Sequence, residues 1–468
     1  MPSSPAVTPS PVQALRAPLS RAAARGDGAL VVAAHESPLP DLLDAFAATG
    51  SDAFYWEQPA QGFGLLALGA ATSIEVAGPG RFAEAARWWR RTVDTAGAAE
   101  VESPASEAPA LPLAVGGFAF AETSPIDDPI WRGWPRGAWV APAVVLERRP
   151  DAGGVQVQVT GPDDVHPATA LAEVALRARP REAPPRDSAA TAPDLQLRDD
   201  PGHGWWDDSL RDVLDEIAAG RLRKQVLARR LQATAADPID ATRVLRALRD
   251  RFPSATIFAL RRGASTFLGA SPEELVGLRG DRVAASALAG TSRGAGDGRW
   301  LLDDCKERRE HAFVVEALRE RLAPICARLH VPDAPELMTL PDLSHLSTAV
   351  CGRLAEPRGL LELIDTLHPT PAVGATPREA DRSAALEPFD RGWYAGPVGW
   401  ARGDRGGEGD AIVALRSALV RGRRAALYAG SGIVQGSDPE LEWREARLKM
   451  AAVRDALGVA AGGDGPPG

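Results

Sequence analysis

The chain has 468 residues, of which 45% are apolar and 25% charged, so it can bury a sizeable hydrophobic core. Its length is about three times the roughly 150 residues of an average domain, which predicts two or three domains or one large α/β unit. A net charge of −9, without basic clusters interleaved with aromatics, argues against nucleic acid or an anionic membrane as a partner.

No apolar stretch approaches the roughly 18 residues that a transmembrane helix needs. The three cysteines lack the paired spacing of a disulfide framework or a zinc site. We therefore expect a cytoplasmic protein.

The composition divides the chain into five parts. Residues 1–28, rich in alanine, serine, proline and arginine, are expected to be a disordered extension. Residues 29–180 are expected to form the N-terminal half of an α+β unit, and the proline-rich residues 181–200 a linker. Residues 201–460 are expected to form the C-terminal part of the fold, and residues 461–468 a disordered tail.

Apolar periodicity predicts helices and strands after residue 200. The predicted helices cover residues 206–220, 241–252, 304–329 and 438–457, and the predicted strands cover residues 225–231, 255–260, 266–270, 396–402, 410–420 and 425–429. Hairpin-like strand pairs mixed with helices favour an α+β fold with large, mainly antiparallel sheets flanked by helices. No glycine-rich nucleotide-binding motif opens a helix.

Lysine is scarce in this chain. Of the 53 basic residues only Lys224, Lys306 and Lys449 are lysines. Arginine stays protonated at ordinary pH, whereas a desolvated lysine can become a neutral base. The three lysine positions are therefore candidates for chemistry.

The helix predicted over 304–329 carries carboxylates on its apolar stripe. Glu307 and Glu310 precede Val314, which marks that stripe, by seven and four residues. The alternative is a surface pair near a helix start, where acids favour the helix dipole.

The last predicted helix repeats this pattern. Ser437 and Glu440 have the spacing of a capping box. Glu445 follows the apolar Leu441 by four residues, and Lys449 follows Glu445 by four, so a solvated ion pair is the ordinary alternative. Two inward carboxylates from separate helices would suit Mg²⁺, which prefers hard oxygen ligands.

Two glycines, Gly430 and Gly432, are predicted to lie between a strand and this last helix. Glycine lets backbone N–H groups approach an anion closely, although a simple tight turn is an equal alternative.

Nine stretches together resemble the chorismate-utilising enzymes, a family that includes the isochorismate, salicylate, anthranilate and aminodeoxychorismate synthases. They are KQVLAR (224–229), ASPEE (270–274), LAGT (288–291), KERREH (306–311), HLST (345–348), HPTPA (368–372), RGWYAG (391–396), ALRS (414–417) and GSDPELEWRE (436–445). A further likeness at GGFAF (116–120) extends the resemblance over most of the chain after residue 28. It implies the chorismate-binding fold of anthranilate synthase component I.

The resemblance also implies a site. It places Mg²⁺ between Glu310 and Glu445 and assigns catalysis to Lys224 as general base and Glu273 as general acid. The substrate-binding residues that it implies are Gly290, Thr291, His345, Ala372, Tyr394, Arg416, Gly430, Gly432 and Lys449. Lys306 matches no substrate contact and is expected to form a structural ion pair.

Two positions bear on the attacking nucleophile. Anthranilate synthases carry glutamine where Lys224 stands, and aminodeoxychorismate synthases commonly carry a nucleophilic lysine where Ala289 stands. The pattern here resembles the water-using branch, and the HPTPA stretch favours isochorismate over salicylate synthase. Ala375 and Ser431 depart from the family pattern and are expected to reshape the pocket slightly.

The expected partner is therefore the substrate chorismate alone, bound by a monomer without an amidotransferase subunit. Salicylate synthase and a non-catalytic chorismate-binding homologue remain alternatives. Both menaquinone and siderophore biosynthesis remain open as the destination of the product.

Overall fold

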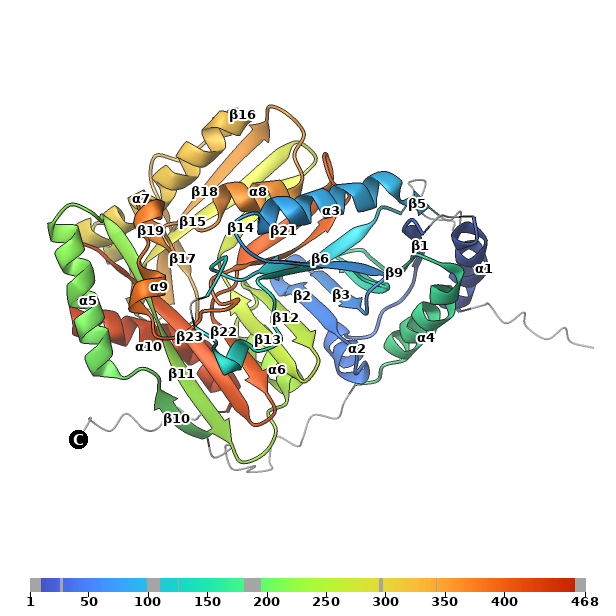
Figure 1. The fold of residues 1–468 in the computed structure, drawn as a ribbon, viewed down its shortest axis with the longest axis horizontal. Coiled ribbons are helices and arrows are strands. Elements are labelled where there is room, and N and C mark those ends of the chain that lie inside the picture. Colours follow the sequence, from blue (N-terminus) through green and yellow to red (C-terminus); the bar gives the residue numbers. More distant parts are fainter. Residues whose placement is uncertain are drawn as a thin grey trace, which may run out of the picture.

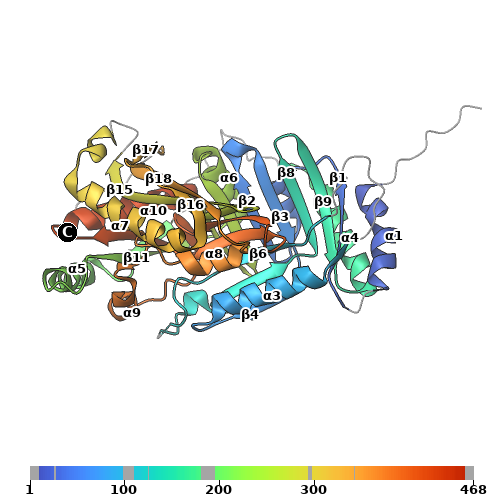
Figure 2. The same ribbon diagram turned by 90° about the horizontal axis from the view of Figure 1, so that it is seen from above.

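The computed structural model describes residues 10–25, 28–98, 110–124, 126–180, 195–293, 298–341 and 343–458. Its described residues form two large β-sheets with helices on their outer faces (Figures 1 and 2). All strand pairs are antiparallel except β1 with β5, so the predicted α+β class is confirmed.

The larger sheet runs in the order β10 (Leu195–Asp199), β11 (Lys224–Ala235), β23 (Arg424–Ile433), β22 (Ser417–Arg421), β13 (Ser265–Ser271), β12 (Thr256–Arg262), β2 (Ala53–Gln58), β3 (Phe63–Leu68), β8 (Val144–Arg149), β9 (Ala152–Val159), β1 (Val31–Glu36) and β5 (Gly97–Ala98), with β19 (Ala375–Thr376) paired to β11. The smaller sheet runs in the order β16 (Cys326–His330), β18 (Leu343–Leu354), β15 (Arg282–Arg293), β14 (Glu274–Arg279), β21 (Glu408–Val413), β20 (Pro397–Arg402), β6 (Leu113–Phe118), β7 (Gly137–Ala141) and β4 (Thr72–Val76), with β17 (Glu336–Thr339) paired to β18.

The helices are α1 (Pro11–Ala23), α2 (Leu42–Ala48), α3 (Arg81–Thr95), α4 (Val165–Leu176), α5 (His203–Ala218), α6 (Ala241–Arg251), α7 (Cys305–Leu322), α8 (Leu360–Leu367), α9 (Ser383–Leu386) and α10 (Pro439–Ala456). Both sheets contain strands from before residue 180 and from after residue 200. The two halves of the chain are therefore interleaved in the same sheets.

Strand alternation separates two hydrophobic cores. Trp56 and Tyr428 belong to the core shared by the two sheets, while their neighbours Tyr55 and Leu427 belong to the core beneath the helices. Successive strand side chains point to opposite faces, so strands such as β2 and β23 serve both cores.

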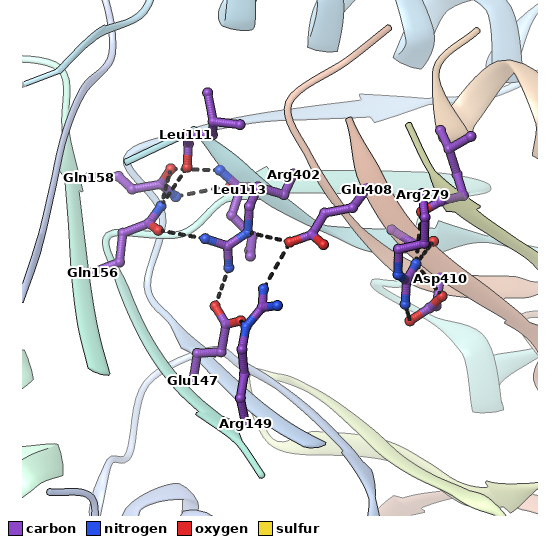
Figure 3. Close-up of polar contacts among 12 residues, drawn as sticks. Leu111, Leu113, Glu147, Arg149, Gln156, Gln158, Arg279, Arg402, Glu408 and Asp410 are labelled. Carbon is purple, nitrogen blue, oxygen red and sulfur yellow. Dashed lines mark hydrogen bonds and ion pairs between the residues drawn. The ribbon is translucent and has the colours of Figure 1, made fainter. Parts of the chain in front are cut away.

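A polar seam joins the two sheets away from the site (Figure 3). Gln158 on β9 accepts a hydrogen bond from the Leu113 N–H at 2.9 Å and donates one to the Leu113 carbonyl at 3.0 Å. Arg402 pairs with Glu147 across the sheets. These contacts satisfy polar groups that are buried between the sheets.

The expectation of a disordered extension over residues 1–28 is wrong for the residues that α1 covers. Ser10 and Gln13 form a capping box, and the helix buries Val12, Leu15 and Leu19. The spacing of three and then four residues makes one apolar face, which the many alanines and arginines mask. Residues 1–9 and 26–27 lie outside the described part.

The linker expectation is also wrong in part, because β10 occupies its last residues and pairs with β11. Residues 181–194 of the linker and the expected tail at 461–468 lie outside the described part. The helix predicted over 304–329 ends at Leu322 and is followed by Pro324, which cannot continue it. Residues 326–330 form β16 instead.

The start of α10 also differs from the prediction. Asp438, not Ser437, is the N-cap and accepts a hydrogen bond from the Leu441 N–H at 3.0 Å. Leu441 is 61% exposed, and the buried face of α10 carries Trp443 and Met450 instead. The inward direction of Glu445 was thus inferred from a leucine that lies on the other face.

Candidate active site

Four neighbouring strands of the larger sheet bring their ends together at one place. Lys224 begins β11, Gly432 lies near the end of β23, Arg416 immediately precedes β22, and Glu273 follows β13. In an antiparallel sheet the start of one strand lies beside the end of the next. The predicted strand over 410–420 is interrupted here, and Arg416 takes a left-handed φ of 48° in the break.

A cavity of about 650 Å³ opens at these strand ends and extends to the smaller sheet. Eleven of the thirteen predicted site residues line it, namely Glu273, Gly290, Thr291, Glu310, His345, Ala372, Tyr394, Arg416, Gly430, Gly432 and Lys449. The other two, Lys224 and Glu445, contact lining residues directly.

Lys224 is fully buried, and its Nζ donates a hydrogen bond to Glu310 Oε1 at 2.9 Å. Gly432 makes this pair possible. A Cβ at that position would lie 2.1 Å from Glu310 Oε1 and 2.9 Å from Lys224 Cε. Gly430 and Gly432 both lie within β23 and not in a turn. The prediction that they lie between a strand and the last helix is therefore wrong.

Glu273 is suited to donate a proton at neutral pH. Its side chain is buried, and burial raises its pKa to about 8 although Lys224 and Lys449 oppose this shift. A carboxyl group with this pKa is mostly protonated at pH 7.

His345 is held neutral between two partners. Burial lowers its pKa to about 3, and the nearby Arg416 adds to this effect. Its Nδ1–H is assigned as donor to the Gly290 carbonyl at 2.9 Å, so its Nε2 accepts from Arg416 Nη2 at 2.8 Å. The histidine thereby orients the guanidinium at the cavity wall.

Tyr394 and Lys449 complete the polar wall near Gly430. The Tyr394 ring stacks on Tyr428 with centroids 5.3 Å apart, and burial raises its pKa. Lys449 donates to the Gly430 carbonyl at 3.2 Å and to Glu445 Oε1 at 2.6 Å. Burial alone would raise the pKa of Glu445, but this lysine lowers it.

Sequence reasoning placed Glu307 on the inner face but gave it no role, and missed Glu442. Each stands three residues before a predicted metal ligand, Glu310 or Glu445. This Glu-x-x-Glu spacing, repeated in α7 and α10, was the available signal.

Glu442 pairs with Lys306 at 2.8 Å, which confirms the structural ion pair expected for that lysine.

The four glutamates lie close enough to influence one another's pKa. Burial, followed by repulsion from Glu310, raises the pKa of Glu307 to about 7, and burial together with Glu445 raises that of Glu442. No set of three or more His, Cys, Asp or Glu side chains within the described ranges is arranged to chelate an ion by itself. A cation here would take few protein ligands and complete its shell with water or substrate oxygens, as Mg²⁺ commonly does.

The two departures from the family pattern lie at different places. Ser431 points away from the cavity and donates to Glu442. Ala375 lies in β19, opposite Gln225 of β11. Neither residue lines the cavity described above.

Comparisons with known proteins agree with this architecture. A profile of the chorismate binding enzymes matches residues 17–458, and the chain belongs to that family. The chain is 37% identical over 455 residues to the salicylate biosynthesis isochorismate synthase of Pseudomonas aeruginosa, covering 94% of this chain and 92% of that protein.

Two solved structures share the fold. The menaquinone-specific isochorismate synthase MenF of Escherichia coli superposes with a TM-score of 0.75 at 26% identity, covering 95% of this chain and all of that one. Anthranilate synthase component I of Streptococcus pneumoniae superposes with a TM-score of 0.67 at 20% identity, covering 84% of this chain and 92% of that one. The predicted fold of that component is confirmed. Within the described residues no helix combines the length and apolar character that a membrane span requires.

Proposed function

We propose that this protein is an isochorismate synthase, which isomerises chorismate to isochorismate by adding water at C2 and releasing the C4 hydroxyl. The observation that carries this assignment is a buried amine, Lys224, and a buried acid of raised pKa, Glu273, at one cavity. Such a pair can take a proton from one oxygen and give a proton to another. The relatives with this printed activity cover nearly the whole chain.

In the proposed reaction Lys224 is the general base that removes a proton from the attacking water. The resulting hydroxide forms the C2–O bond, the ring double bonds shift, and the C4–O bond breaks. Glu273 gives its proton to the departing hydroxyl, which leaves as water. One water enters and one leaves, so the reaction is an isomerisation.

The substrate carboxylates would be bound by cationic and hydroxyl groups of the cavity. Arg416 and Tyr394 are assigned to the enolpyruvyl carboxylate, because a guanidinium can bond both carboxylate oxygens. Lys449 is assigned to the ring carboxylate. The hydrogen bond from Arg416 to His345 keeps the guanidinium aimed before substrate arrives.

Glu310 and Glu445 would hold Mg²⁺. When bound, the cation would polarise the ring carboxylate and favour the shift of electrons toward it.

The choice of water as nucleophile depends on two side chains. Ala289 lines the cavity and offers no amine. Lys224 is hydrogen-bonded to the cavity-lining Glu310 and is the amine assigned to activate water. Chorismate is therefore the only partner that the reaction requires, and we propose that a cytoplasmic monomer acts without an amidotransferase.

Isotope labelling tests this assignment. In water enriched in ¹⁸O, one label should appear in the C2 hydroxyl of the product, as measured by mass spectrometry with fragment analysis. Product that keeps only unlabelled hydroxyl oxygen would contradict attack by solvent water.

A further inference from the structure

A second cavity lies behind the wall of the active site. It opens to solvent, with about 1110 Å³ of free space including its mouth, between the start of α3, residues 120–124 that follow β6, and residues 369–391, which include α9. Figure 2 shows α3 and α9 along the same long side of the molecule. The proposed reaction assigns this cavity no role.

Its lining combines aromatic rings with arginines. Phe120 and Phe389 contribute ring edges, and Arg81, Arg378 and Arg391 line the cavity together with four acids. Apolar ring edges with a few convergent cations suit a small aromatic carboxylate.

Two of these arginines retain unused hydrogen-bond donors. Arg81 is buried, and its Nε has no partner among the described residues. Its Nη2 donates to the Phe120 carbonyl at 3.3 Å, and its Nη1 lies 3.7 Å from the half-exposed Glu122. Arg378, at the surface end, forms no ion pair within the part of the chain that the structure describes. Burial lowers the pKa of Arg81 to about 10; Glu122 and Asp365 oppose this shift, and the neighbouring Arg378 adds to it.

All four acids that line the cavity are engaged, Glu122 by its ion pair with Arg81. Glu387 accepts from Arg391 at 2.7 Å, and Asp390 accepts from Arg136 at 3.1 Å. Asp381 accepts from the backbone N–H and the hydroxyl of Ser383 at 2.8 and 2.5 Å. The cationic hydrogen-bond donors of this cavity that have no acceptor among the described residues are therefore on Arg81 and Arg378.

Arg391 links this cavity to the active site. Its guanidinium donates to the Val373 carbonyl at 2.8 Å and to the Val226 carbonyl at 3.0 Å. Val226 and Val373 both line the active-site cavity. A ligand that shifts Arg391 would therefore shift the backbone of the active-site wall.

We propose that this second cavity binds a small aromatic carboxylate through Arg81 and Arg378, and that its occupancy changes chorismate affinity through Arg391. The binding claim stands whether or not the proposed reaction does. Only the coupling claim uses that reaction.

Calorimetry with salicylate as the probe tests the binding claim. Arg378→Gln should weaken salicylate binding by about tenfold, the loss expected for one charge-assisted hydrogen bond. Arg416→Gln, in the active site, and Arg353→Gln, an exposed control on β18, should leave it unchanged. Loss of binding in Arg416→Gln alone, no binding to the wild type, or equal displacement by inorganic phosphate would each overturn the proposal.

Kinetics test the coupling. Salicylate should change the KM for chorismate in the wild type and in Arg353→Gln but not in Arg378→Gln. An unchanged KM in the salicylate-bound wild type would overturn the coupling while leaving the proposed reaction intact.

Discussion

A buried lysine and a buried glutamate share the two proton transfers of the proposed reaction. Glu273 has no ion-pair partner within hydrogen-bonding distance among the described residues, and burial raises its pKa to about 8, so it is suited to donate a proton. Lys224 lies beside the cavity-lining Glu310 and is the amine assigned as general base.

Substitutions of Lys224 distinguish a role as general base from a role as the ion-pair partner of Glu310. Lys224→Gln should lower kcat by on the order of a hundredfold or more, the loss expected for a positioned general base. Lys224→Arg keeps the positive charge beside Glu310 but cannot be deprotonated, so it should be equally impaired. Steady-state kinetics of both purified variants check this. Recovery of activity in the arginine variant would assign the lysine a purely structural role.

Glu273 should impose an alkaline limit on activity. A carboxyl group of pKa about 8 is protonated below that pH and ionised above it. The proposed acid must be protonated, so kcat/KM should fall about tenfold per pH unit above pH 8. In Glu273→Gln the residual activity should lose this limb. A limb of the same position in the glutamine variant would show that another group titrates there.

At the scale of elements, two helices and one strand bring the acidic side chains together. Helix α7 carries Glu307 and Glu310, helix α10 carries Glu442 and Glu445, and β23 passes between them at a glycine. This close approach depends on a missing side chain at Gly432.

Gly432→Ala should therefore displace the Glu310 carboxylate and the Lys224 amine without unfolding the protein. We expect kcat to fall on the order of tenfold to a hundredfold, because small displacements of reacting groups are costly. Gly204→Ala in α5 is the matched control, since a Cβ there meets no atom within 4 Å. Equal kinetics of the two variants would contradict the packing described here.

Helix α1 should contribute to stability. Leu15 is fully buried, and Leu15→Ala should cost about 2–5 kcal/mol of unfolding free energy. Val174→Ala, at a half-exposed position of the neighbouring α4, is the control. Urea unfolding followed by circular dichroism measures both. Equal midpoints would mean that α1 does not pack as described.

At the scale of the whole molecule, the sequence predicted the fold class and most of the C-terminal elements. It could not predict the interleaving of the two halves. Strand β2 pairs with β12, about 200 residues later, and local periodicity does not encode such partners.

The site was predictable where a residue type has few alternative uses. Scarce lysines, inward glutamates and the family motifs identified the polar residues, and the cavity collects them. The apolar lining residues Val226, Leu288 and Leu415 were missed. The sequence does not distinguish a strand valine or leucine that lines a cavity from one that packs in an ordinary core.

Product analysis tests the central claim most directly. Purified protein with chorismate and Mg²⁺, without ammonia or a second subunit, should yield isochorismate as the main product in a reversible mixture, separated by chromatography. Excess chelator should abolish the conversion and added Mg²⁺ should restore it, because Glu310 and Glu445 would lose their cation. Stoichiometric salicylate and pyruvate, or a product that forms only when ammonia is present, would contradict the assignment.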